Sequence, residues 1–212
     1  MYEGRKLTVL DQIAASDEVR RKIIDAASVL YAKKGFKATS IQEISELAGV
    51  SLPVTYHYIK SKSEIMSMIM EDLLMSFKAS LEENLKGYED PEEKLAVATI
   101  LYYKIVDSNK EKALLIYQKS ISLDKASKSK IMSLEVDVSQ IFVKILEEGI
   151  QKGVFRPVDV DLMAYNIIML AHMWALKQWH FKKRLTIDEY INHQLKTILI
   201  SLQPEKNSGY ES

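Results

Sequence analysis

SIQEISELAGVSLPVTYHYIKSK, residues 40–62, is the most informative segment of the chain. Its pattern predicts two short helices, at about 41–47 and 52–58, with a turn at Gly49, because glycine readily adopts the left-handed conformation that ends a helix. A helix-turn-helix of this size can place its second helix in the major groove of DNA. Three side chains of that helix have polar tips suited to phosphates and base edges: Tyr56, His57 and Tyr58.

Capping residues set the predicted ends of these helices. Ser40 and Glu43 have the spacing of a capping box, with serine at the N-cap and glutamate three residues later. Ser51 is expected to cap the second helix. Ser61 and Glu64 form a further predicted box, which opens another helix at the next residue. Three capped helices are also compatible with an ordinary all-helical core.

An earlier helix is predicted at about 17–34, with Ser16 as its N-cap and Gly35 as its end. Residues 1–15 form an N-terminal extension with Arg5 and Lys6 near its start. This extension is interpreted as a basic arm that reaches DNA, as a short helical extension, or as a remnant of an expression tag. The predicted DNA-binding domain therefore covers residues 16–62.

Residues 20–65 resemble the DNA-binding domain of the tetracycline-repressor (TetR) family. The resemblance rests on a dense series of short motifs: Gly35-Phe36, Ala38-Thr39-Ser40-Ile41, Ala48-Gly49-Val50-Ser51, Tyr56-His57-Tyr58 and Lys60-Ser61-Lys62. Members of that family are mostly dimeric repressors that lose affinity for their operator when a small molecule binds a larger C-terminal domain. The resemblance implies the same arrangement here.

The family's DNA contacts carry over to particular positions of this sequence. Phosphate contacts are implied for Ser40, the backbone at Ile41, and Lys62. Groove or base-edge contacts are implied for Ser51, Leu52, Pro53, Val54, Tyr56 and His57. Leu52 departs from the usual basic or polar residue, so that Leu52 and Val54 either meet thymine methyl groups or face inward.

The composition is compatible with a DNA-binding regulator, and the sequence lacks the common motifs of enzymes. The 212 residues have zero net charge, but residues 1–62 hold 10 basic against 7 acidic residues, so positive charge lies where phosphate attraction requires it. Cysteine is absent, and the sequence has no zinc, dinucleotide, phosphate-loop or nucleophile-elbow motif. No enzymatic activity, metal or cofactor is expected. Without a signal peptide or membrane span, a cytoplasmic location is expected.

The remainder of the chain predicts helices only, so the fold class is all-α with about nine helices. After the helix-turn-helix domain, residues 63–203 form a larger ligand-binding and dimerisation domain, and residues 204–212 a loose tail. Helices are expected at about 62–86, 91–106, 111–123, 127–152, 160–181 and 187–202. The last two are apolar on more than one face, and the resemblance implies that they form a homodimer interface.

Aromatic residues and methionines supply candidates for an apolar effector site. The candidates are Phe77, Tyr102, Tyr103, Tyr117, Phe142, Met169, His172, Met173 and Trp174. Each of them also suits an ordinary core. A similarity around residues 173–184 to family members that sense fatty acids or acyl-coenzyme A thioesters makes these the candidate effectors. The predicted function is therefore a ligand-responsive repressor that binds a near-palindromic double-stranded operator as a dimer. The alternative is an all-helical protein-interaction module that does not bind DNA.

Overall fold

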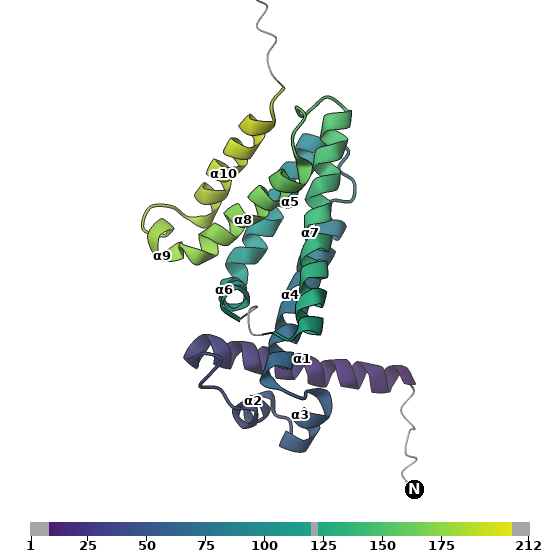
Figure 1. The fold of residues 1–212 in the computed structure, drawn as a ribbon, viewed down its shortest axis with the longest axis vertical. Helices are drawn as coiled ribbons and strands as arrows, with labels where there is room; N and C mark the ends of the chain where they lie inside the picture. The colour runs from purple at the N-terminus through teal and green to yellow at the C-terminus, as the bar shows by residue number, and fades with distance from the viewer. Residues whose placement is uncertain (1–8, 120–122, 205–212) are drawn as a thin grey trace, which may run out of the picture.

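The computed structural model describes residues 9–119 and 123–204, and within these ranges it contains ten α-helices and no strand (Figure 1). The all-α fold class is confirmed. The helices are α1 (Val9–Lys34), α2 (Ile41–Ala48), α3 (Leu52–Tyr58), α4 (Lys62–Asn84), α5 (Pro91–Ser108), α6 (Lys110–Lys119), α7 (Lys125–Gln151), α8 (Val160–Leu176), α9 (Gln178–Phe181) and α10 (Ile187–Leu202).

Helices α1 to α3 form the head at one end of the molecule, with α1 lying across the base of the body (Figure 1). The prediction that Ser16 caps a helix from residue 17 is wrong, because α1 already begins at Val9. No glycine or proline interrupts residues 9–16, so helical hydrogen bonding continues through them. Three interpretations of the N-terminal extension were open, and the helical one is correct for residues 9–15. Residues 1–8 lie outside the described part of the chain.

Most predicted caps are present. The Ser40–Glu43 box is complete, and Gly49 ends α2 with φ 65°. Ser51 occupies the N-cap of α3, but its side chain makes no capping hydrogen bond, so that part of the prediction is wrong. At α4 only half of the expected box forms: the Glu64 N–H donates to Ser61 Oγ at 3.1 Å, while the Glu64 carboxylate accepts from the preceding loop.

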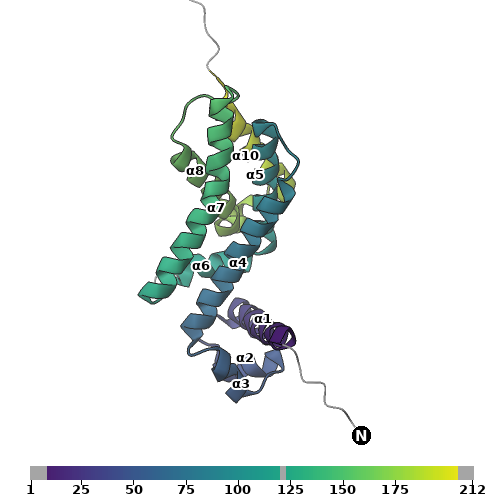
Figure 2. The ribbon, with the colours of Figure 1, turned by 90° about the vertical axis from the view of Figure 1, so that its right-hand side faces the viewer.

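The body is built around α4, α5, α7 and α8, and α10 packs against α5 (Figures 1 and 2). Its long connector α4 starts in the head and runs upward into the body beside α7 (Figure 2). Side-chain caps at Asp90, Asp124, Asp159 and Thr186 start α5, α7, α8 and α10. The connector therefore belongs to both halves of the molecule.

The predicted single helix at 160–181 is broken at Lys177, which accounts for ten helices rather than about nine. Trp174, just before this break, makes two contacts: its indole N–H donates to Asp107 Oδ1 on α5 at 2.8 Å, and its ring stacks on Phe181 beyond the break. With the chain turned at Lys177, the centres of the Trp174 and Phe181 rings lie 6.3 Å apart. Among the described helices, none is long and apolar enough to cross a membrane.

Candidate DNA-binding surface and effector cavity

Helix α3 lies at the end of the head that points away from the body (Figure 1). Tyr56 is 53% exposed, Val54 40% and Leu52 36%. Leu52 and Val54 therefore face outward, which settles the alternative of an inward orientation. Ser51, Pro53 and His57 are exposed beside them. Together these side chains give α3 an uncovered surface of polar tips and small apolar groups, the kind of surface that reads base edges and thymine methyl groups.

A buried pair of hydroxyl groups fixes α3 against α2. Ser45 Oγ and Thr55 Oγ1 lie 2.9 Å apart, and both side chains are almost fully buried. Each hydroxyl also bonds one turn back along its own helix, to Ile41 O and Ser51 O respectively. The pair sets the angle at which the exposed face of α3 is presented. This pair was not predicted, although polar residues at inward helical positions were the available signal.

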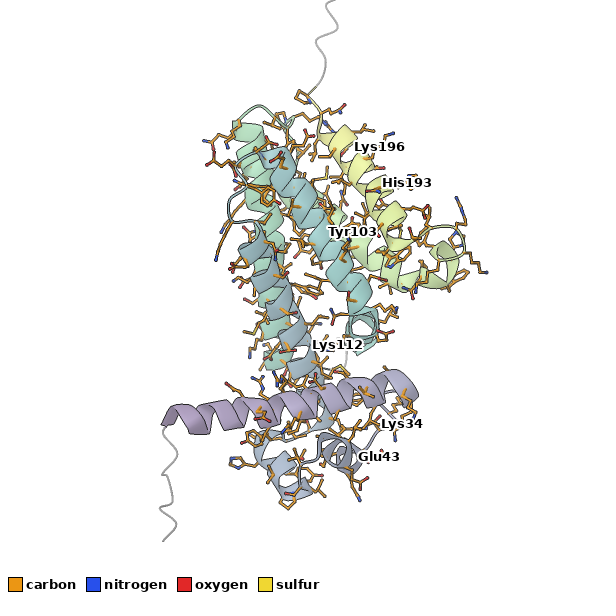
Figure 3. All side chains as sticks on the ribbon, turned by 180° about the vertical axis from the view of Figure 1, so that it is seen from behind. Lys34, Glu43, Tyr103, Lys112, His193 and Lys196 are labelled. Atoms are coloured by element: carbon orange, nitrogen blue, oxygen red, sulfur yellow. The ribbon has the colours of Figure 1, made fainter. Side chains whose placement is uncertain are left out.

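The start of α2 is held in a charged network (Figure 3). Ser40 Oγ donates to Glu43 Oε2 at 2.8 Å, and Lys34 at the end of α1 forms an ion pair with the same carboxylate. The hydrogen bond from Lys34 and those from Ser40 lower the pKa of Glu43 to about 2. Ser40 is exposed at this edge and Ile41 half-buried, so both positions expected near phosphate are accessible or close to the surface.

Lys62 has a different environment from the one the resemblance implies. Its Nζ lies 2.8 Å from Thr39 O, 3.0 Å from Phe36 O and 3.4 Å from Lys37 O, and sits 4.9 Å from the centre of the Phe36 ring. An ammonium group has three donors, and these three carbonyls occupy them. Lys62 thus ties the α1–α2 turn to the start of α4, and its phosphate contact stays a prediction.

A cavity of about 360 Å³ lies in the body. Its wall comes from α4, α5, α6, α7 and α8 and from Leu123, two residues before α7, and is mostly apolar. The lining residues are Leu73, Leu74, Phe77, Tyr102, Ala113, Leu123, Lys128, Ile131, Met132, Glu135, Val138, Tyr165, Ile168, Met169 and His172. A cavity of this size and character fits a small apolar group.

The polar groups of the cavity lining are the Tyr102–His172 pair, the Tyr165 hydroxyl and two charged side chains at the rim. Tyr102 Oη lies 2.8 Å from His172 Nε2, and burial lowers the pKa of His172 to about 4. The imidazole is therefore uncharged at neutral pH. Lys128 and Glu135 are exposed at the α7 side, where burial of part of the Glu135 carboxyl raises its pKa. Charge lies at the rim and the interior is neutral.

Four of the predicted effector residues line the cavity: Phe77, Tyr102, Met169 and His172. The structure places Tyr103, Phe142 and Trp174 in the core and Met173 half-buried outside the lining. The side chain of Tyr117 lies outside the described residues. Sequence reasoning missed the α7 wall, whose signal was an apolar face at helical spacing from Ile131 through Val138. Within the described ranges no cluster of three histidine or acidic side chains could hold a metal.

Two family models match the chain. The model described as tetracyclin repressor-like, C-terminal domain, covers residues 88–199, more than half of the chain. The model described as bacterial regulatory proteins, tetR family, covers residues 23–68, which include the whole helix-turn-helix. The N-terminal match contains the exposed α3, and the C-terminal match contains most of the cavity wall.

Individual relatives agree with the family models. The HTH-type transcriptional regulator HbdR of Aromatoleum sp. (strain CIB) is 30% identical over 179 residues, which cover 84% of this chain and 78% of the relative. FadR from Bacillus subtilis, solved in complex with stearoyl-CoA, shares the fold with a TM-score of 0.75 at 22% identity, over 86% of this chain and 99% of that one. AibR, solved with isovaleryl coenzyme A and operator DNA, has a TM-score of 0.72 at 20% identity, over 84% of this chain and 97% of that one. The chain belongs to the TetR family of bacterial transcriptional regulators, which are not enzymes.

Proposed function

We propose that this protein is a dimeric repressor that binds a near-palindromic operator and dissociates from it when an acyl-coenzyme A thioester binds. The observation that carries the proposal is the course of α4. This one helix starts in the head at Lys62 and lines the cavity with Leu73, Leu74 and Phe77. A ligand in the cavity therefore contacts the helix that carries the head.

The chemistry of the cavity supports an acyl group as the part of the effector that is buried. The Tyr102–His172 pair is neutral, and charge is confined to the rim. At about 30 Å³ for each water-sized group, 360 Å³ accommodates about a dozen non-hydrogen atoms. A short or medium acyl chain or an aryl acyl group fits this volume, whereas the coenzyme A part stays outside, where Lys128 offers a positive charge. The relatives solved with stearoyl-CoA and isovaleryl coenzyme A support the same ligand class.

Dimerisation through α8 and α10 supports recognition of a two-fold operator. Leu162 and Met169 on α8 and Ile200 on α10 are large apolar side chains exposed to solvent. Burying them against a second copy would set two α3 helices at a fixed separation. Sedimentation of a Leu162→Glu, Ile200→Glu double variant should give monomers, whereas Met75→Glu, an exposed position on α4, should stay dimeric.

DNA binding is tested by selecting genomic fragments with the purified protein and titrating salt by fluorescence anisotropy. The logarithm of affinity should fall linearly with the logarithm of salt concentration, by about 0.9 for each phosphate neutralised. Tyr56→Ala should weaken binding, while Tyr88→Ala, an exposed tyrosine before α5, should not. Failure to select any salt-sensitive fragment would favour the protein-interaction module instead.

Effector binding is tested with octanoyl-CoA, octanoate, coenzyme A and stearoyl-CoA in thermal-shift and DNA-release assays. Octanoyl-CoA should raise the melting temperature and release DNA more than the other three compounds. Met132→Trp places a bulky ring at the rim of the cavity and should weaken this response. Val136→Trp lies one turn further along α7, outside the lining, and serves as the matched control. An equal response to octanoate would assign the site to free fatty acids.

A further inference from the structure

We infer that Glu71 is a positioning residue that joins the effector cavity to the DNA-binding head. The inference rests on the proposed function and names the contact through which the cavity acts. Glu71 lies on α4 just above the head, and its side chain is only 10% exposed. A carboxylate this buried is stable only when neighbouring groups compensate its charge.

Three groups surround this carboxylate, and they come from three different helices. Ser67 on α4 donates its hydroxyl to Oε1 at 3.1 Å. Lys130 on α7 donates to Oε2 at 2.7 Å. Arg20 on α1 places its guanidinium 3.7 Å from the same Oε2. The head helix and the body helix therefore share one oxygen atom as their common ionic partner.

Both body helices that meet at Glu71 continue directly into the cavity wall. Lys128, Ile131 and Met132 line the cavity on either side of Lys130, and Leu73 and Leu74 follow Glu71 on α4. In the folded chain, α1 crosses the lower part of α4 (Figures 1 and 2). A group that widens the cavity between α4 and α7 acts on the contact between Lys130 and Glu71.

The direction of the effect follows from the shared oxygen. With the cavity closed, Lys130 holds Oε2 and leaves Arg20 in a loose ion pair at 3.7 Å. When α7 moves away, the full charge of Glu71 becomes available to Arg20, and α1 is drawn toward α4. The head then changes its orientation. The ligand binds more tightly to the state in which Lys130 no longer contacts Glu71, and so favours that state.

The chain offers a matched control for this contact. Lys78 on α4 and Asp137 on α7 form an ion pair at 2.9 Å between the same two helices, further up the body. This pair does not involve α1. Removing it deletes an ion pair between α4 and α7 without touching the link to the head.

The test compares Lys130→Met, Glu71→Gln and Lys78→Met with the wild type, using a selected DNA fragment and octanoyl-CoA. Lys130 is 61% exposed, so Lys130→Met leaves the core intact and covers the case in which Glu71→Gln folds poorly. Without ligand, Lys130→Met should weaken DNA binding about fivefold or more, the lower end of ordinary coupling factors, because it leaves the charge of Glu71 to Arg20. Glu71→Gln removes that charge and should not show this weakening. The ratio of DNA affinities without and with octanoyl-CoA should also approach one in both. Lys78→Met should stay within about twofold of the wild type on both measures.

Hydrogen exchange of the α1 amides in the ligand-free protein gives a readout that needs neither DNA nor effector. Lys130→Met and Glu71→Gln should change exchange near Arg20, and Lys78→Met should not. Wild-type coupling retained in both variants, with unchanged exchange in α1, would overturn the inference and direct attention to α6, which also packs on α1. A wild type that ignores octanoyl-CoA or DNA would instead count against the proposed function, while the exchange experiment would still decide the role of Glu71.

Discussion

Replacing Lys62 with alanine removes an ammonium group that holds three backbone carbonyls of the α1–α2 turn. Two of its hydrogen bonds are short, at 2.8 Å to Thr39 O and 3.0 Å to Phe36 O, and the third is 3.4 Å long. A hydrogen bond to a charged group contributes about 1.5–3 kcal/mol, and an exposed cation–π contact about 0.5–1 kcal/mol. Because the site is only partly buried, water replaces some of what is lost. We expect a net destabilisation of about 2–3 kcal/mol.

That destabilisation is measurable by calorimetry. For a chain of this length, 1 kcal/mol shifts the melting temperature by about 2–4 °C, so Lys62→Ala should lower it by about 4–12 °C. Lys60→Ala is the matched control, because Lys60 is an exposed lysine two residues away. Loss of an exposed side chain outside such a network changes stability by less than about 0.5 kcal/mol.

The salt dependence of DNA binding separates this structural role from a phosphate contact. A lysine that neutralises a phosphate contributes about 0.9 to the slope of log affinity against log salt. The carbonyl contacts predict that Lys62→Ala retains the wild-type slope, measured at a temperature where the variant is folded. A variant that melts with the wild type and loses about one unit of slope would refute this reasoning and support the phosphate contact that the resemblance implies.

Three further predictions concern other parts of the molecule. Thr55→Val removes the hydroxyl that meets Ser45 in the head, and should cost about 1–3 kcal/mol in chemical unfolding while weakening DNA binding. Gly149→Ala would place a Cβ 2.0 Å from the ring of Phe155, so the free energy of unfolding should fall by about 1–3 kcal/mol. A wild-type melting temperature would contradict this expectation. His172 has its pKa lowered by burial from 6.5 to about 4, so between these pH values the unfolded chain binds more protons and stability falls as pH falls. Across that window the free energy of unfolding of the wild type should fall by up to roughly 3 kcal/mol more than that of His172→Gln. Parallel profiles of unfolding free energy against pH would show that His172 does not titrate as described.

Helix boundaries were predictable where local chemistry sets them. The Ser40–Glu43 box and Gly49 fixed both ends of α2 as predicted, because each acts within a few residues of itself. Predicted helix boundaries were wrong where contacts between residues far apart in the sequence determine the end of a helix. The break at Lys177 depends on Trp174, which bonds to Asp107 some seventy residues earlier and stacks on Phe181. No local signal marks that turn.

The α3 surface was predictable to the level of its exposed residues, but its support was not. Tyr56 lies outward as the motif predicts, and Val54 takes the outward of the two orientations that the sequence left open. Lys62 has the residue type and position that the resemblance assigns to phosphate, yet its donors reach carbonyls of a loop more than twenty residues earlier. Sequence position identifies the residue, whereas three-dimensional packing decides which of its possible partners it meets.

The cavity was the least predictable feature. It is a place where side chains pack incompletely, and incomplete packing leaves no periodic pattern in the sequence. Tyr102 and Tyr103 make the difficulty concrete, since they are adjacent on α5 and both are almost fully buried. Tyr103 donates its hydroxyl to Ile167 O at 3.0 Å within the core, whereas Tyr102 meets His172 at the cavity wall. A rotation of about 100° around the helix separates the two environments. Residue type alone could not distinguish them, but their hydroxyl partners do: Tyr103 bonds a main-chain carbonyl of α8, which fixes the packing of α5 on α8. Tyr102 bonds a side chain, which a ligand can reorganise without breaking a helix.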